Sequence, residues 1–382
     1  MKICLDARQI RRYPTGLGSY ARSLVKHLAA VDGDNDYVVL RHDSDSPIVT
    51  RDNFTEVSLP YTIFTLRNMV SGAAAIRQID ADLYHSLFHF LPFGNGLPAT
   101  LVSLHDLIAV EHSKLSLDSR TKRWWKSSWA RPLLRRSLTK VDHVVATSDS
   151  TRDAALARYG LQPERITTVQ PGVDDRWRGT QDIEVPDVAR SGRPFIFSLG
   201  NTHPYKNVPR LLHAFAGIAP VFPDVDLVVS GRGRSYGTLQ RLAHRLDISA
   251  RVRFTGTPSD AEIKGCFREA LFFAFPSLVE GFGLPVLEAM ASGCPVLTSN
   301  CSALKEVAEG AAELVDPTDT DAIAAGMTRL IEREDLRRAC LTCNLIRRSK
   351  HREPCRSVKL SGHTQHRAMN TLPMILGNLD SR

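Results

Sequence analysis

The chain has 382 residues, of which 43% are hydrophobic and 24% charged, and its formal net charge at pH 7 is +8. This length suits two domains, and the composition excludes a largely disordered protein. The excess charge lies in residues 336–382, where ten Lys/Arg stand against two Asp/Glu, so the other 335 residues are neutral in sum. A nucleic-acid groove would place its basic residues on the folded body, beside aromatics or a reading helix, and no such motif occurs there. We therefore expect no nucleic-acid partner.

The first residues and the cysteines bear on localisation. Asp6 and Arg8 stand where a secretory signal needs an apolar stretch, and no run is apolar and long enough to span a bilayer. The seven cysteines are odd in number, and four of them are far apart, at 4, 266, 294 and 301. This usage indicates reduced thiols rather than a disulfide framework, and we expect a cytoplasmic protein.

Short apolar runs alternate with helix-length amphipathic stretches, which is the pattern of parallel α/β layers. Strands are predicted at 2–6, 37–40, 82–85, 100–104, 143–146, 195–199, 226–230, 252–255, 271–275 and 295–298. A polar stretch with prolines predicts a linker at 181–194, between domains at 1–180 and 195–335. The pattern favours two facing, doubly wound Rossmann-like domains. Ligands of such sheets bind beyond the carboxyl ends of the strands, so the turns after strands are the places to examine.

Two turns in the first half have the composition of a binding site. Gly16 and Gly18 lie in Thr15-Gly16-Leu17-Gly18-Ser19-Tyr20, which follows the opening strand and begins a helix. Glycines there let the backbone approach a ligand closely at a helix N-terminus. His105, in a His-Asp pair after the strand at 100–104, is either a binding group or a buried structural histidine bonded to Asp106.

The segment 119–140 is basic and aromatic. It contains eight Lys/Arg, no acidic residue, and three tryptophans, Trp124, Trp125 and Trp129. Basic residues with tryptophans on a helix suit an anionic membrane surface, and an ordinary solvated helix with one packed aromatic stripe is the alternative. On the membrane interpretation the protein is peripheral on the cytoplasmic membrane face.

In the second half, a turn with Gly200 and Lys206 follows the strand at 195–199. A lysine entering a helix beside glycine can neutralise the charge of a diphosphate. Tyr205 directly precedes this lysine and the loop contains no arginine, so Arg232, after the next strand, is a candidate second cation.

The most informative stretch is Glu280-Gly281-Phe282-Gly283-Leu284-Pro285-Val286-Leu287-Glu288, after the strand at 271–275. Pro285 suits the first turn of a helix, which should close at Gly293. The N–H groups of residues 281–284 would then point out of the helix start and form an anion site. Glu280 and Glu288, on either side of the glycine turn, suit pairs of sugar or ribose hydroxyls.

At these residues the chain resembles glycosyltransferase family 4, which has the GT-B fold and a Glu-x7-Glu motif. The resemblance covers roughly residues 1–335. It implies that Glu288 holds the donor ribose, that Glu280 contacts the transferred sugar, and that Lys206 neutralises the diphosphate. It also implies that Gly16 and Gly18 adjoin the donor phosphates, and that His105 lies near the donor sugar between the lobes. Members retain the anomeric configuration and generally use no metal or cofactor.

The predicted activity is therefore transfer of a sugar from a nucleotide-diphosphate donor to a glycan or lipid-linked acceptor. Cleavage of the anomeric bond generates an oxocarbenium-like sugar. By the family analogy we expect same-face attack by the acceptor hydroxyl, with catalytic roles for His105, Glu280 and Lys206. The pair at His105 resembles the His-Asp pair of many family 4 mannosyltransferases, and this resemblance implies GDP-mannose as the first candidate donor. A sugar-nucleotide epimerase, which converts donor without acceptor, and a non-enzymatic binding protein are the alternatives.

Residues 336–382 depart from the family pattern. The amphipathic period ends near Leu336, where members continue into a long helix, and basic residues and cysteines follow. Cys340, Cys343, His351 and Cys355 could ligate zinc, but their spacing fits no familiar module. A change of reading frame explains the shift in composition better, and it predicts a mobile tail and a weakened fold.

Overall fold

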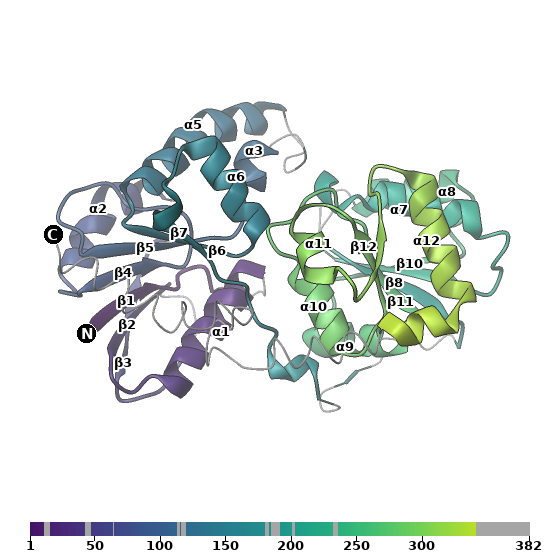
Figure 1. Cartoon of the computed structure of the whole chain (residues 1–382), viewed down its shortest axis with the longest axis horizontal. Coiled ribbons are helices and arrows are strands. Elements are labelled where there is room, and N and C mark those ends of the chain that lie inside the picture. The colour runs from purple at the N-terminus through teal and green to yellow at the C-terminus, as the bar shows by residue number, and fades with distance from the viewer. Residues whose placement is uncertain are drawn as a thin grey trace. The chain divides into compact units, whose positions relative to one another are not determined.

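The computed structural model describes residues 1–10, 16–42, 47–63, 65–112, 115, 120–179, 183–184, 192–200, 203–231 and 236–340, without the side chains of 120–128. The chain divides into two compact units (Figure 1). Unit 1 contains the described residues within 1–110 and 125–172, and unit 2 those within 111–124 and 173–352.

Unit 1 is built on a seven-stranded sheet whose neighbouring strands are parallel, in the order β3-β2-β1-β4-β5-β6-β7. Its strands are β1 (Lys2–Asp6), β2 (Asp36–His42), β3 (Phe54–Leu59), β4 (Leu83–Ser86), β5 (Ala99–Leu104), β6 (His143–Ala146) and β7 (Ile166–Thr168). The helices between them are α1 (Gly16–Val31), α2 (Leu66–Arg77), α3 (Ile108–Glu111), α5 (Arg120–Lys140), α6 (Asp149–Tyr159) and the 3-10 turn η1 (Pro163–Arg165).

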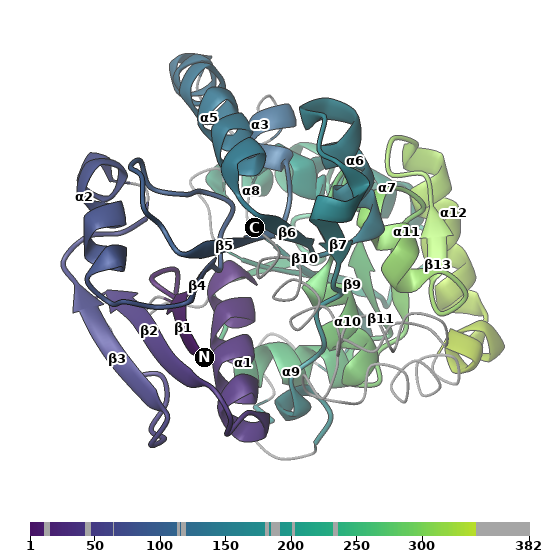
Figure 2. The same ribbon diagram turned by 60° about the vertical axis from the view of Figure 1, so that its left-hand side comes forward.

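Two apolar layers cover the faces of this sheet. On one face α1 buries Ala21 and Val25 against β1 and β2. On the other face α2, α5 and α6 bury Ile76, Leu134 and Ala155 against β4, β5 and β6 (Figure 2). Because helices cover both faces of the sheet, the strands are continuous apolar runs in the sequence.

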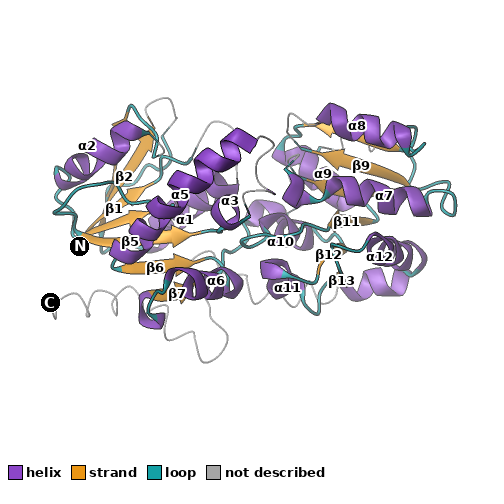
Figure 3. Ribbon diagram, turned by 90° about the horizontal axis from the view of Figure 1, so that it is seen from above, coloured by secondary structure: helices purple, strands orange, loops and turns teal. Residues whose placement is uncertain are grey.

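Unit 2 is built on a six-stranded sheet, also with parallel neighbours, in the order β10-β9-β8-β11-β12-β13. Its strands are β8 (Phe195–Leu199), β9 (Asp226–Ser230), β10 (Val252–Gly256), β11 (Phe272–Phe275), β12 (Val296–Ser299) and β13 (Glu313–Val315). Its helical elements are η2 (Asp175–Trp177), η4 (Pro204–Lys206), α7 (Val208–Ile218), α8 (Tyr236–Arg245), α9 (Asp260–Glu269), α10 (Leu284–Ala291), α11 (Ser302–Ala308) and α12 (Thr320–Glu332). Figure 3 separates the strands from the helices that cover them.

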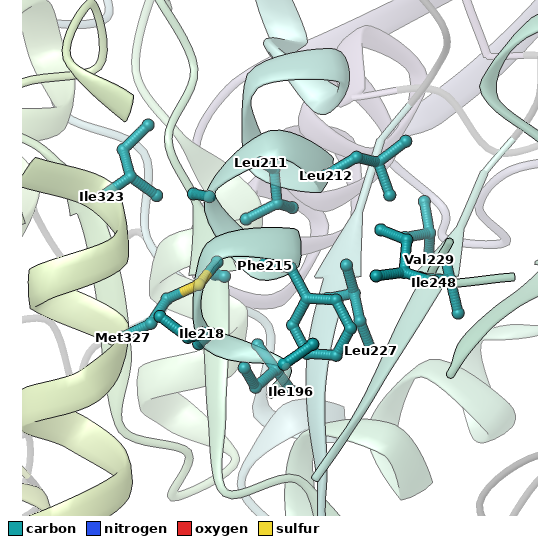
Figure 4. Packing of buried hydrophobic residues seen from close by; sticks show 14 of the residues in the cluster. Ile196, Leu211, Leu212, Phe215, Ile218, Leu227, Val229, Ile248, Ile323 and Met327 are labelled. Carbon is teal, nitrogen blue, oxygen red and sulfur yellow. The ribbon is translucent and has the colours of Figure 1, made fainter. Parts of the chain in front are cut away.

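One face of this second sheet packs on α7 and α12. Leu211 and Phe215 of α7 meet Ile196 and Leu227 of the strands and Met327 of α12 (Figure 4). The other face packs on α9 and α10, and the two layers bury the sheet on both sides. These layers hold the loops at the carboxyl ends of the strands on a rigid base.

In each sheet the strand order reverses beside the first strand of the unit, between β1 and β4 and between β8 and β11. At such a point the connecting helices leave to opposite sides and open a crevice at the carboxyl ends of the strands. The predicted fold class, two doubly wound Rossmann-like domains, agrees with both sheets.

All ten predicted strands are present within two residues of their bounds, and β3, β7 and β13 are additional. All three lie at sheet edges, and β7 and β13 have only three residues each. The division between the units falls after Gly172. The sequence placed Trp177 in the first domain, but its ring packs in the core of unit 2, with its centroid 5.9 Å from that of Phe267. Of the expected linker, the structure describes only 183–184 and 192–194.

The chain remains helical beyond the end of the predicted amphipathic period. Residues 334–340 are helical, Leu336 packs against the α7–α12 core, and Cys340 is buried. Residues 341–382, including Cys343, His351 and Cys355, lie outside the described residues, so the mobile tail and its reading-frame origin stay predictions. Among the helices described, none is long and apolar enough to cross a membrane.

Candidate active site

The glycine turn before α10 is built around Gly283. Its φ is +108°, and a Cβ there would lie 2.6 Å from Cδ2 of Leu304, so both conformation and space require glycine. Pro285 stands in the first turn of α10, and Gly293, with φ +81°, follows its C-terminus, as predicted. The N–H groups of Phe282, Gly283 and Leu284 find no hydrogen-bond acceptor among the described residues. These amides at a helix start can receive an anion.

Glu288 lies one turn into α10 with a half-buried side chain. Its carboxylate has no hydrogen bond or ion pair with any described residue. Burial raises its pKa to about 7, while the nearby Arg176 lowers that pKa and Asp260 and Asp174 raise it further. A carboxylate without a partner at this depth suits a ligand that brings its own hydroxyl donors.

The raised pKa of Glu288 predicts a pH dependence of stability. In the folded chain the carboxyl holds its proton up to about pH 7, whereas the unfolded chain releases it near pH 4.5. Folding stability from this group is therefore present below pH 4.5 and is lost as pH rises to about 7. Compared with wild type, Glu288→Gln should become more stable across this window, by at most about 3 kcal/mol. Urea unfolding at several pH values measures the difference, and a constant difference from pH 4.5 to 7.5 would contradict it.

The loops after β8 and β11 meet at the reversal point of the second sheet. Lys206 Nζ lies 2.7 Å from Glu280 Oε1, and the two side chains are 12% and 11% exposed. The ammonium also stands over the rings of Phe275 at 4.6 Å and Tyr205 at 5.2 Å. The sequence assigned the two charged residues to separate parts of the donor. In the structure the two side chains form an ion pair with each other.

Gly200 lies beside this pair, as the sequence predicted. A Cβ on Gly200 would touch Cγ and Cδ of Lys206 at 3.4 Å. The end of β9 is pressed against the same loop, because a Cβ on Gly231 would overlap the carbonyl of Gly200 at 1.5 Å. Arg232 follows this contact but lies outside the described residues, so its role as a second cation stays a prediction.

In unit 1, His105 is buried at the end of β5. Its Nε2 lies 2.9 Å from the carbonyl oxygen of Leu87, and since a carbonyl only accepts, this nitrogen carries the proton. Burial lowers the pKa of His105 to about 4, so the ring is neutral near pH 7. Asp106 instead accepts from the N–H of Ile108 at 2.8 Å, so the alternative of a His105–Asp106 bond is wrong.

The remaining predicted positions of unit 1 lie at the start of α1. Gly16 is the first residue of this helix, and a Cβ added to it would meet nothing within 4 Å. Gly18 is buried. Tyr20, two residues later, packs edge-on against His105 with ring centroids 4.6 Å apart. The predicted glycine turn and the predicted histidine are thereby brought together within unit 1.

Sequence reasoning missed other polar residues at the same edge. Tyr20 Oη and His85 Nε2 lie 3.4 Å and 3.0 Å from Ser103 Oγ. Gln9 follows β1, is 6% exposed, and its amide nitrogen has no partner among the described residues. The Asp6–Arg8 ion pair, 2.6 Å long and fully buried, fixes the turn that carries Gln9. A charged pair at the end of the first predicted strand was the signal available for this turn.

Comparison with known proteins supports one family for both units. Residues 14–177 match Glycosyltransferase Family 4, and residues 180–342 match Glycosyl transferases group 1. The O-antigen chain mannosyltransferase B of Escherichia coli is 26% identical, covering 88% of this chain and 92% of its own. The MMP alpha-(1->4)-mannosyltransferase of Mycolicibacterium hassiacum is 30% identical, covering 70% and 66%.

Solved structures show the same fold. Sucrose-phosphate synthase from Thermosynechococcus elongatus superposes with a TM-score of 0.72 at 18% identity, over the whole of both chains. WaaG, a glycosyltransferase involved in lipopolysaccharide biosynthesis, superposes with a TM-score of 0.69 at 18% identity, over 91% of this chain and 95% of its own.

Two parallel α/β units, matched by these structures, define the GT-B fold. The chain belongs to the group 1 glycosyltransferases of the family 4 type and is mannosyltransferase-like. The predicted family, fold and hexosyltransferase class are confirmed.

Proposed function

We propose that the enzyme transfers mannose from GDP-mannose to a hydroxyl of a glycan or lipid-linked acceptor, with retention of configuration and without a metal. The observation that carries the proposal is the Lys206–Glu280 pair, 2.7 Å apart, with Glu280 at the start of the glycine turn. Two relatives named as mannosyltransferases support the sugar, and one of them is named for the O-antigen chain, which supports a glycan acceptor.

The ion pair indicates how the site rearranges on donor binding. As the diphosphate arrives, Lys206 exchanges the carboxylate for phosphate oxygens, and the amides of residues 282–284 bind the same anion. Glu280 is then released to accept hydrogen bonds from the sugar, while Glu288 accepts from the ribose. We assign Arg232, Gly281, Gly16 and Gly18 to the donor as well, on the family resemblance.

The chemistry follows the charge. The bond between the anomeric carbon and the phosphate oxygen breaks, leaving an oxocarbenium-like sugar and a diphosphate whose charge Lys206 stabilises. The acceptor hydroxyl attacks from the same face, and its proton passes to the departing phosphate oxygen. His105, neutral because burial lowers its pKa, acts as a hydrogen-bonding group toward the sugar.

A donor panel tests the proposal. Ligands that bind the folded state raise its apparent stability, so GDP-mannose should raise the melting temperature more than UDP-glucose or ADP-glucose. With a mannoside acceptor, the NMR spectrum of the product should show the anomer of the donor, with and without EDTA. A larger rise in melting temperature with UDP-glucose would contradict GDP-mannose as the donor. Conversion of the donor to an epimer without acceptor would favour the epimerase.

The structure also bears on the predicted membrane surface. Neither α2 nor α5 contains an acidic residue. Leu66 and Val70 of α2 are 81% and 79% exposed, Trp129 of α5 is 67% exposed, and Phe93 lies between the two helices. The N–H of Phe93 donates to Met69 of α2, and its ring lies 4.2 Å from the guanidinium carbon of Arg136 of α5. The exposure of Trp129 argues against a stripe packed entirely inside.

We therefore extend the proposed membrane surface from 119–140 to α2 and Phe93. Exposed apolar side chains among arginines suit an anionic bilayer on the cytoplasmic face, where a lipid-linked acceptor would be held. Trp124 and Trp125 belong to this proposed surface, and their side chains are not among those that the structure describes.

Replacing Leu66 and Val70 together by glutamate should lower binding to phosphatidylglycerol vesicles at least tenfold, because two apolar contacts become repelled charges. Val221→Glu is the matched control, since Val221 is equally apolar and 67% exposed but belongs to unit 2. Vesicle sedimentation measures the effect, and transfer to a soluble acceptor should stay unchanged. Equal binding by wild type and the double variant, or binding to neutral phosphatidylcholine alone, would contradict the surface.

A further inference from the structure

The residue after Lys206 has an unusual conformation and unusual partners. Asn207 has φ +60° and ψ +22°, the left-handed region, and stands between η4 and α7. Its side chain is 4% exposed. The Nδ2 group donates one hydrogen bond to the carbonyl of Pro276 at 2.9 Å and another to the carbonyl of Pro317 at 2.7 Å. Its Oδ1 accepts from Arg210 at 2.7 Å.

These bonds join three strands of unit 2 at their carboxyl ends. Asn207 belongs to the loop after β8, Pro276 follows β11 directly, and Pro317 lies in the loop after β13. Pro276 also begins the loop that carries Glu280. A backbone bond from the N–H of Leu278 to the carbonyl of Tyr205, at 2.8 Å, ties the same two loops. The amide of Asn207 therefore fixes the loop of Lys206 against the loop of Glu280.

Asparagine meets both requirements of this position. It adopts the left-handed region more readily than most residues, and its amide offers two donors and an acceptor. Glycine would satisfy the backbone but leave the buried carbonyl of Pro276 without a donor, and the carbonyl of Pro317 with only its bond from Arg210 at 3.1 Å. Aspartate would keep the shape but place oxygens against oxygens.

We propose that Asn207 is a positioning residue, which holds the ammonium of Lys206 where the diphosphate of the donor arrives. The inference rests on the proposed role of Lys206 in transfer. A group that stabilises developing charge must be held within a fraction of an ångström, because a misplacement of about 1 Å can lower the rate about a hundredfold. Asn207 fixes the backbone of Lys206, while Gly200 and Phe275 confine its side chain.

A double-mutant cycle separates this role from a general effect on folding. In Asn207→Gly, kcat should fall about tenfold or more, with a smaller change in KM for the donor. In the Lys206→Ala background the same replacement should change kcat less than twofold, because the group it positions is gone. Asn207→Asp should behave like Asn207→Gly. Arg210→Ala removes the bonds to Asn207 Oδ1 and to the carbonyl of Pro317 but keeps both bonds of Nδ2, so it should give a milder loss and serves as the test if the Asn207 variants fold poorly.

Asp247→Gly is the matched control. Asp247 also has a left-handed backbone, with φ +56°, but follows α8 and so lies toward the amino ends of the strands. This variant should keep wild-type kcat. If Asn207→Gly costs the same factor with and without Lys206, or if every Asn207 and Arg210 variant keeps full activity, the positioning role is overturned. If Lys206→Ala itself leaves transfer unchanged, the proposed function of Lys206 fails instead.

Discussion

Lys206→Ala should lower kcat for sugar transfer by on the order of a hundredfold, which is the effect of removing one preorganised group that stabilises developing charge. The ring faces of Phe275 and Tyr205, whose centroids lie 4.6 Å and 5.2 Å from the ammonium, keep it in place after the donor displaces Glu280. Little reorganisation is then needed when the phosphate leaves. Steady-state kinetics with saturating donor and acceptor measures the change.

Lys305→Ala is the control for the loss of a positive charge from unit 2. Lys305 lies on α11, is 54% exposed, and forms an i,i+4 pair with Glu309 at 3.8 Å. Its replacement should leave kcat unchanged, because exposed pairs of this kind contribute little. Unchanged kinetics of Lys206→Ala itself would mean that Arg232 or the amides of the glycine turn stabilise the diphosphate.

The Lys206→Ala variant should also lose stability, because Lys206 is the ion-pair partner of Glu280. Lys206→Ala leaves the Glu280 carboxylate mostly buried without its partner, which destabilises the fold as well as the transition state. The double variant Lys206→Ala/Glu280→Gln removes that charge. It should regain thermal stability without regaining activity, which separates the two consequences.

Much of the architecture could be predicted from the sequence because both sheets are covered on both faces. Strands such as β8 and β11 are buried and flanked by amphipathic helices, so apolar runs mark them. Edge strands gave a weaker signal. β3 has Thr55, Glu56 and Ser58 among its six residues, because it lies at the edge of the sheet and pairs with a strand on one edge only.

The candidate site was predictable as a set of loops but not as a set of contacts. Each predicted loop follows a strand, so the chain order alone places it at the carboxyl edge. Lys206 and Glu280 are 74 residues apart, and their contact depends on β8 and β11 being neighbours in the sheet. The bonds of Asn207 to Pro276 and Pro317 depend on the same arrangement. No periodicity in the sequence encodes which strands are neighbours.

The two glutamates of the glycine turn should differ in which step they affect. Glu288→Ala should weaken donor binding about tenfold to a hundredfold, because a hydrogen bond to a charged group contributes about 1.5–3 kcal/mol. The carboxylate of Glu288 has no partner among the described residues, so its removal breaks no hydrogen bond with them. Glu280→Ala should mainly lower kcat, because Glu280 contacts the sugar that is transferred.

Calorimetric titration of the donor, combined with steady-state kinetics, distinguishes the two roles. For Glu288→Ala the dissociation constant should rise with little loss of kcat at saturating donor, since ribose contacts are the same in the ground and transition states. For Glu280→Ala the opposite is expected, a loss of kcat without a loss of donor affinity. Its removal also takes away the carboxylate that competes with the diphosphate for Lys206, so donor affinity can increase while turnover falls. Equal donor affinity and equal rates in wild type and both variants would show that the two glutamates do not contact the donor.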